Sequence, residues 1–271
     1  MDIWFLYQLP VWFTAVFVTA TLIVAMEVGY RVGRRKYLAT VECSPSEGGD
    51  VALASILALL GLVLAFTFSY TMSRFDSRKQ AVLEEANAIG TAFLRAGLAP
   101  EPSRSQLRQI LQDYAKTRDV TKVNAVSPRA IRRVVERSLA AQSLLWPATE
   151  TLVRSATTAG PVEVAIVQSI NEVIDVHGKR LLAVTDRLPG VVFMLLVFIA
   201  GTAMFIIGFH AGRQGSLNRW RLALLGLVLA AVITVITDFD RPGTGLVRVN
   251  QQPIVDLIRD MDATLQKDSA K

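Results

Sequence analysis

The chain has little of what most enzymes and metalloproteins use. Its 271 residues include one cysteine, Cys43, and two histidines, His177 and His210. A single cysteine excludes an intrachain disulfide. The sequence contains no HExxH, P-loop, G-x-S-x-G or dinucleotide-binding fingerprint. It therefore predicts no enzyme, no metal site and no cofactor.

Nucleic-acid-binding signatures are also missing. The net charge is +6, but no Lys/Arg-rich run, zinc spacing or aromatic RNA-binding motif accompanies it. Membrane proteins carry basic flanks for another reason, because cations gather at the ends of their spans. The sequence therefore predicts no nucleic-acid partner.

Long uncharged runs are what the chain does have. Val51 to Met72 contains no charged residue, and as a helix it would extend about 33 Å, enough for a bilayer core of about 30 Å. The run passes without Gly or Pro into a segment rich in helix formers. Val82, Ala86, Ile89 and Phe93 recur there at helical spacing. One helix is thus predicted to leave the bilayer as an amphipathic extension.

Three further runs complete the membrane pattern. Val11 to Met26 lies between aromatic and basic flanks, Leu188 to Phe209 is uncharged, and Leu222 to Thr237 is a shorter apolar run. Gly190, Gly201 and Gly208 mark places where another helix can approach closely.

The predicted fold is an all-α integral membrane protein with four transmembrane helices (2+2) and a central α-helical extramembrane domain. The first pair occupies 1–72 (about 10–30 and 51–72) and the domain 73–187. The second pair occupies 188–237 (about 188–209 and 220–237), and a C-terminal tail occupies 238–271. The lipid bilayer is therefore the first predicted partner.

Helix signals continue through the central domain. Pro100 and Pro102 break the long helix, and Ser103 or Ser105 is placed to cap the next one. Ser127-Pro128 is a helix start, Trp146-Pro147 ends or kinks that helix, and a further one is predicted from about 161 to 187. Pro253 to Leu265 is predicted as a last amphipathic helix. No strand-like alternation competes with these patterns.

Charge counting does not orient the protein. Four spans place both termini on the side of the central domain. The short loops hold seven cations and the span ends on the other side hold eight, which is a tie for the positive-inside rule. The short-loop cations are Arg31, Arg34, Arg35, Lys36, Arg213, Arg219 and Arg221.

The second span carries a stripe of large side chains. Leu62, Phe66 and Tyr70 fall at i, i+4 and i+8, so they share one helix face. Spacing alone favours a packed bundle core. If copies of the helix surround an axis, the stripe instead forms stacked apolar rings that gate a pore.

Polar residues of the extension allow two interpretations of equal weight. Either they line an ion-attracting vestibule, or Arg78 pairs with neighbouring turns and the rest are exposed. Asn87 needs a buried partner if it faces inward. The residues concerned are Arg74, Asp76, Arg78, Glu84, Glu85 and Asn87.

Two acidic groups resemble metal sites only superficially. His177 lies near Glu172 and Asp175, but one turn of an amphipathic helix produces such neighbours by chance. After the last span come Asp238, Asp240, Arg241 and Pro242. Two carboxylates fall short of the six to eight oxygens that Ca²⁺ takes, so capping or pairing with Arg241 is favoured.

The second span and its extension resemble a known family. The run 59–70, LLGLVLAFTFSY, is similar to the second transmembrane helix of the bestrophin anion channels. Nearly the whole chain resembles the bacterial bestrophin-like proteins of unassigned function. The pattern of that group appears as Arg78, as EEANAIGT at 84–91, as Leu94-Arg95, and as Asp238 to Pro242.

The resemblance implies a homo-oligomer, pentameric in bestrophins, that passes anions through a neck at Leu62, Phe66 and Tyr70. It also implies a multi-pass protein of the cell (inner) membrane with the central domain and both termini cytosolic. The acidic run that bestrophins use for Ca²⁺ is reduced here to Asp238 and Asp240. The alternative function is a non-conducting membrane protein whose α-helical domain acts as a sensor or scaffold.

Overall fold

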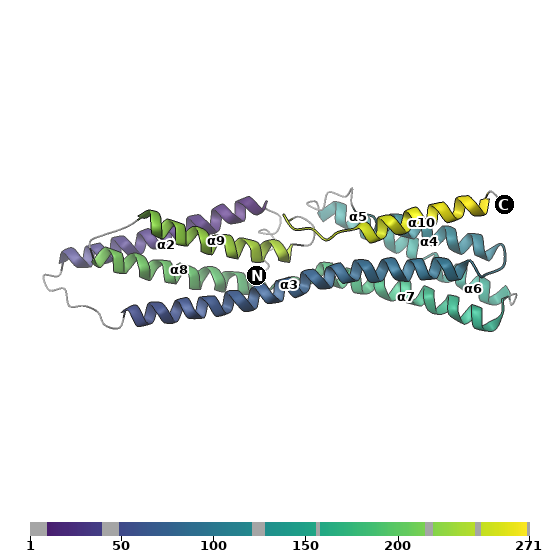
Figure 1. Cartoon of the computed structure of the whole chain (residues 1–271), viewed down its shortest axis with the longest axis horizontal. Helices are drawn as coiled ribbons and strands as arrows, with labels where there is room; N and C mark the ends of the chain where they lie inside the picture. Colours follow the sequence, from purple (N-terminus) through teal and green to yellow (C-terminus); the bar gives the residue numbers. More distant parts are fainter. Residues whose placement is uncertain are drawn as a thin grey trace. The chain divides into compact units, whose positions relative to one another are not determined.

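The structure is a computed structural model of the whole chain (Figure 1), and it describes residues 10–39, 49–120, 128–155, 158–214, 219–241 and 245–269. Over these ranges every regular element is a helix. The chain divides into two compact units. A membrane unit comprises Met1–Phe75 and Arg187–Val247, and a helical unit comprises Asp76–Asp186 and Arg248–Lys271. The all-α fold predicted from the sequence is confirmed.

The membrane unit contains the four apolar helices. They are α2 (Val11–Ala39), the first part of α3 (Gly49–Ala96), α8 (Gly190–Arg213) and α9 (Arg219–Asp240). Each is long and apolar enough to cross a bilayer. α7, which precedes α8, carries five charged side chains, so the uncharged crossing segment lies in α8. Val18, Leu22, Leu60, Met204 and Ile233 meet in the core of this unit.

Glycines bring α2 and α8 into backbone contact. A Cβ on Gly29 or Gly33 would lie under 3.0 Å from the carbonyl oxygen of Phe205 or Phe209, and Gly208 and Gly212 meet α2 in the same way. The two helices run parallel, because both contact positions advance together by four residues. Each helix thus presents a G-x-x-x-G pair, a sequence that permits close packing in membranes.

The predicted close approach at Gly208 is therefore found. At Gly201 no atom of another described segment lies within 4 Å of the Cβ position, so the described residues make no close approach there.

The helical unit is formed by five helices and the second part of α3. The five are α4 (Ser103–Arg118), α5 (Pro128–Gln142), α6 (Leu145–Ser155), α7 (Gly160–Thr185) and α10 (Gln252–Ser269). Their apolar faces form one core that includes Ile89, Phe93, Leu107, Leu111, Tyr114, Leu152 and Ile170. The apolar residues that recur at helical spacing in the sequence are the ones that face this core.

Local signals explain most helix boundaries. α5 begins at Pro128, as predicted, and Ser127 lies outside the described residues. Pro147 falls in the first turn of α6, where its missing N–H is tolerated. The start of α4 differs from the prediction, because neither serine caps it. The Glu101 carboxylate accepts the Ser105 N–H at 3.2 Å instead.

α10 packs on the helical unit. Met261 is buried in its core, Arg108 pairs with Asp268 and Lys116 lies 3.6 Å from Asp262. The sequence placed residues 238–271 in one tail. The structure divides that segment, because α10 belongs to the helical unit and residues up to Val247 belong to the membrane unit.

Candidate functional site

The predicted stripe of α3 is exposed in the single chain. Leu62, Phe66 and Tyr70 are 53%, 68% and 45% exposed, although their side chains are large and mostly apolar. A different face of the same helix is buried, through Leu60 and Thr71. α3 therefore packs on its own unit with one face and leaves the Leu62–Phe66–Tyr70 face uncovered.

Threonine hydroxyls near the stripe donate hydrogen bonds to backbone carbonyls of α3 itself. Thr71 donates to the carbonyl oxygen of Thr67 at 3.0 Å, and Thr67 donates to that of Leu64 at 3.2 Å. Both threonines are buried. Thr67 therefore lies away from the exposed stripe and does not add polarity to it.

Arg74 places a cation at the end of the stripe. Its guanidinium carbon lies 4.4 Å from the centre of the Tyr70 ring, and the guanidinium also donates to the Tyr70 hydroxyl. A cation over an aromatic face is attracted by the ring quadrupole. Tyr70 thus holds a positive charge beside the uncovered face.

The remaining extension residues separate into an exposed and a buried group. Asp76 and Lys79 lie 3.9 Å apart on the surface, Gln80 donates to Glu84 at 3.0 Å, and Asn87 is exposed. Arg78 and Glu85 are 3% and 0% exposed. Neither interpretation from sequence describes these two residues, because they point into the helical unit.

Arg78 binds the end of α7. Its Nε donates to the carbonyl oxygen of Ala183 at 3.1 Å and its Nη2 to that of Asp186 at 3.2 Å. The last carbonyls of a helix have no partner in their own helix and carry partial negative charge. Arg78 satisfies two of these acceptors and so stabilises the end of α7.

Glu85 is the centre of a buried polar network. Arg118 of α4 donates to its Oε1 at 2.8 Å, and Arg180 of α7 donates to its Oε2. Arg118 also reaches Ser138 of α5 at 3.0 Å, and Arg180 reaches Gln251 at 2.7 Å. One carboxylate thus joins α3, α4 and α7, and its two arginines extend the network to α5 and to the residue before α10.

Tyr114 and His177 extend the network further. The Tyr114 hydroxyl donates to Glu85 Oε1 at 3.1 Å and lies 3.0 Å from His177 Nδ1. Because its proton goes to Glu85, this hydroxyl accepts from Nδ1–H. His177 Nε2 is left as a buried acceptor without a hydrogen-bond partner among the residues that the structure describes. Burial, and next the charge of Glu85, raises the pKa of Tyr114. Tyr114 therefore stays a donor.

His177 is expected to make the stability of the helical unit pH-dependent. Burial first, and then the charge of Arg118, lowers the pKa of His177 below its ordinary value. The folded state therefore favours neutral histidine, and its stability is complete above about pH 6.5, the value in an unfolded chain. We expect stability to fall as the pH drops from there through the lower folded-state pKa.

The measurement is the unfolding temperature between pH 7.5 and pH 4.5 for the native chain and for His177→Asn, whose amide nitrogen can replace Nδ1–H. Below pH 6.5 the unfolding temperature of this variant should fall less than that of the native chain. His210→Asn, in α8, is the matched control and should keep it. If the unfolding temperatures of all three proteins fell equally with pH, His177 would not be the source of the pH dependence.

Residues after the last span bind within the membrane unit. Both carboxylate oxygens of Asp240 accept the Leu188 N–H, each at 3.0 Å. Asp238 accepts the N–H groups of Leu246 and Val247 at 2.9 and 3.1 Å. Arg241 donates to Thr14 at 2.8 Å, and Pro242 lies outside the described residues. The motif thus connects the end of α9 to the chain before α8 and to α2.

The carboxylates of Asp238 and Asp240 are already hydrogen-bonded within the protein. Ca²⁺ takes six to eight oxygens, whereas Asp238 and Asp240 are directed at backbone donors. No group of three His, Cys, Asp or Glu side chains that could hold a metal occurs in the described part of the chain. His177 is buried while Glu172 and Asp175 are exposed, so the three do not converge.

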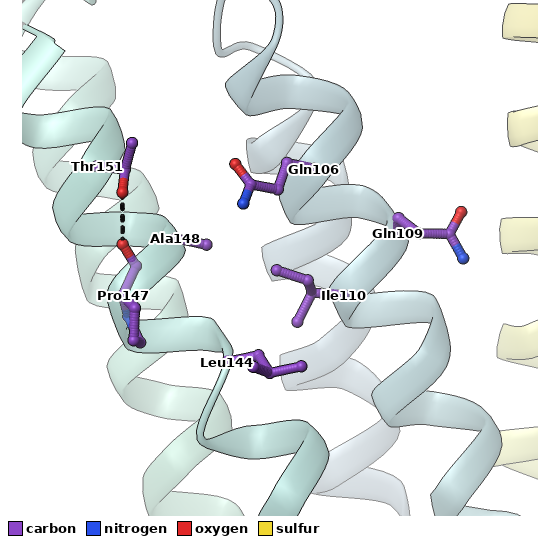
Figure 2. A pocket seen from close by; sticks show the side chains of 7 residues that line it. All are labelled: Gln106, Gln109, Ile110, Leu144, Pro147, Ala148 and Thr151. Atoms are coloured by element: carbon purple, nitrogen blue, oxygen red, sulfur yellow. Dashed lines mark hydrogen bonds between the residues drawn. The ribbon is translucent and has the colours of Figure 1, made fainter.

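A shallow groove of about 400 Å³ lies between α4 and α6. Figure 2 shows Gln106 and Ile110 of α4 facing Ala148 of α6 and Leu144, which precedes it, while Gln109 points away from them. Every lining residue is uncharged. Sequence spacing gave no signal for this groove, because its residues come from two helices.

Comparison with known proteins places the chain in a family. The model of the bestrophin-like domain matches residues 16–254. Two variants of a bacterial bestrophin homolog from Klebsiella pneumoniae superpose with TM-scores of 0.64 and 0.63 at 13% and 14% identity, each covering 96% of this chain and 98% of the other. A crystal structure described as a membrane protein has a TM-score of 0.67 at 12% identity, over 94% and 99% of the two chains.

No curated protein sequence matches the chain. The structural likenesses lie at identities that show a shared fold, and they fit the four apolar helices and their helical unit. Together with the domain match over most of the sequence, they identify a membrane protein that belongs to the bestrophin-like family.

Proposed function

We propose that copies of this chain surround an axis and form an anion-conducting pore, with Leu62, Phe66 and Tyr70 of each copy as its neck. The observation that carries the proposal is the exposure of these three side chains on one face of α3. Stacked rings of such side chains make an apolar constriction that water leaves readily, and such a constriction gates ion flow.

The coverage of α3 supports an oligomer. In the single chain 11% of the apolar membrane-crossing segment of α3 is buried, against 39% of that of α9. Cyclic assembly would cover part of that surface, because each α3 would meet α3 of its neighbours. Five subunits, a cytosolic helical unit with cytosolic termini, and the inner membrane follow from the family resemblance and belong to the proposal.

Arg74 supports anions as the permeant species. Repeated around an axis, Arg74 would form a ring of guanidinium groups next to the Tyr70 ring. Pores for anions use rings of Arg or Lys, and pores for cations use rings of acidic side chains. The contact between Arg74 and Tyr70 holds this charge at the end of the neck.

Replacing Phe66 with alanine is expected to increase anion flux several-fold, because the apolar ring that Phe66 forms in the proposed neck becomes wider and easier to hydrate. The measurement is chloride and iodide flux from proteoliposomes containing the purified full chain. Phe68→Ala is the matched control. Phe68 lies on the opposite side of α3 from Phe66, with its ring 6.0 Å from that of Phe239, and its loss should leave flux unchanged.

Two outcomes would overturn the proposal. One is the absence of flux above empty vesicles for both the native chain and Phe66→Ala. The other is a monomer or two-fold dimer in electron-microscope class averages of the purified protein, since only a closed ring creates a neck. Either result would favour the sensor or scaffold function for the helical unit.

A further inference from the structure

The exposed apolar faces of α2 and α9 each end in arginine side chains. On α2, Phe13, Phe17, Val24 and Val28 are exposed, and helical spacing places Arg31 and Arg35 on the same face. On α9, the exposed Leu224, Val228 and Val235 share a face with Arg221. In a bilayer, side chains on such faces meet lipid, and the arginines extend the same surfaces.

These cations lie at one end of the membrane unit. Arg241, near the end of α9, binds Thr14, near the start of α2, so the two helices run antiparallel and Arg35 and Arg221 are at the same end. At 1.5 Å per residue Arg31 and Arg35 lie about 5 and 10 Å beyond Val28. Those distances correspond to the headgroup layer outside a hydrocarbon core.

In the described residues, the opposite end of the same two helices presents no exposed charged side chain. α2 has no charged residue from Val11 to Met26, and the charged residues that end α9 and follow it, Asp238, Asp240 and Arg241, are buried. The exposed charge on the two helices is therefore confined to one headgroup level. Arg34, Lys36, Arg213 and Arg219 add four more cations there, and the exposed aromatic rings of Tyr37 and Trp220 suit the same level.

Acidic side chains are fewer than cations in this part of the chain. Glu27 accepts from Arg31 Nε at 3.0 Å, yet the Arg31 side chain is 71% exposed. Three more acids, Glu42, Glu47 and Asp50, follow in the sequence between Ala39 and Val51. From Glu27 to Asp50 and from His210 to Arg221 the sequence thus holds seven cations and four acids. Each guanidinium group can bind two phosphate oxygens at once.

We propose that this basic end, defined by Arg31, Arg35 and Arg221, binds the phosphate groups of anionic phospholipids whose acyl chains lie along the exposed faces of α2 and α9. The inference goes beyond the channel proposal, since it requires neither an axis nor conduction. Each Lys or Arg near an anionic membrane surface contributes about fivefold to affinity.

The test is native mass spectrometry of the full chain in detergent, titrated with dioleoyl phosphatidylglycerol or with the phosphatidylcholine of the same chains. We expect phosphatidylglycerol to bind several-fold more tightly. The triple variant Arg31→Gln, Arg35→Gln and Arg221→Gln should weaken it on the order of tenfold or more. The corresponding Arg→Lys variant, which keeps the charge, should retain most of the binding.

The matched control removes three exposed arginines from α5 in the helical unit, Arg132→Gln, Arg133→Gln and Arg137→Gln, and should bind phosphatidylglycerol as the native chain does. Equal binding of the two lipids, an unchanged affinity in the α2/α9 variant, or the same loss in the α5 variant would each overturn the proposal. Glycerol phosphate without acyl chains should not compete at the lipid concentrations used, and competition would show that the apolar faces take no part.

Discussion

Glu85→Ala is expected to destabilise the helical unit by about 3–5 kcal/mol, the cost of removing one partner from a buried ion pair. The carboxylate is fully buried and accepts from Arg118, Arg180 and Tyr114. Without it two guanidinium groups remain in the interior with no counter-charge. The measurement is denaturant unfolding followed by the fluorescence of Trp146, with Trp4, Trp12 and Trp220 replaced by phenylalanine.

The neighbouring residue supplies the control. Glu84 is partly exposed and accepts from Gln80 one turn away, so Glu84→Ala should cost about 0.5 kcal/mol or less. Glu85→Gln keeps the shape but not the charge, and it should remain strongly destabilising. Replacing Glu85, Arg118 and Arg180 together by apolar residues should recover most of the loss. Equal effects of the two alanine variants would exclude the network as a source of stability.

The fold is predictable from the sequence because its main signals are local. An uncharged run that is long enough to cross a bilayer has few alternatives, which is why α3 and α8 are anticipated. The proline that opens α5 acts on its own peptide bonds and specifies a boundary without reference to distant residues. The pairing of α2 with α8 could not be predicted from local signals, because about 180 residues separate the two G-x-x-x-G pairs.

The candidate site is predictable only in part. The stripe on α3 follows from spacing within one helix, and the exposure of Phe66 shows which face it occupies. The network of Glu85 does not follow, because Arg118 and Arg180 lie 33 and 95 residues away. A charged side chain on an amphipathic helix is usually solvated, so the composition of the extension gave no reason to bury one.

One signal for the network was nevertheless present. Arg78 and Glu85 fall in step with Val82, Ile89 and Ala92, at alternating intervals of three and four residues, and all five side chains are buried. A charge that keeps the register of an apolar face must be paired inside or must interrupt the core. On α7, His177 and Arg180 keep the register of Ile170 and Val173 in the same way.

Gly208→Ala is expected to destabilise the membrane unit by about 1–3 kcal/mol, the usual cost of forcing an extra group into a packed interior. The added Cβ would lie under 3.0 Å from the backbone carbonyl of Met26. Backbone cannot rotate aside as a side chain can, so α2 and α8 must move apart and lose contacts at Gly29 and Gly212 as well. Thermal unfolding of the detergent-solubilised chain measures the effect.

Gly201→Ala makes the same substitution on the same helix, at a position where no atom of another described segment lies within 4 Å of the new Cβ. Alanine is the better helix former by up to about 1 kcal/mol, so this variant should be neutral or slightly stabilised. Gly29→Ala combined with Gly208→Ala should cost less than the sum of the two single variants, because one separation of α2 from α8 relieves both clashes. Full additivity would mean that the glycines act independently, and equal stability of Gly208→Ala and Gly201→Ala would show that backbone contact does not hold α2 and α8 together.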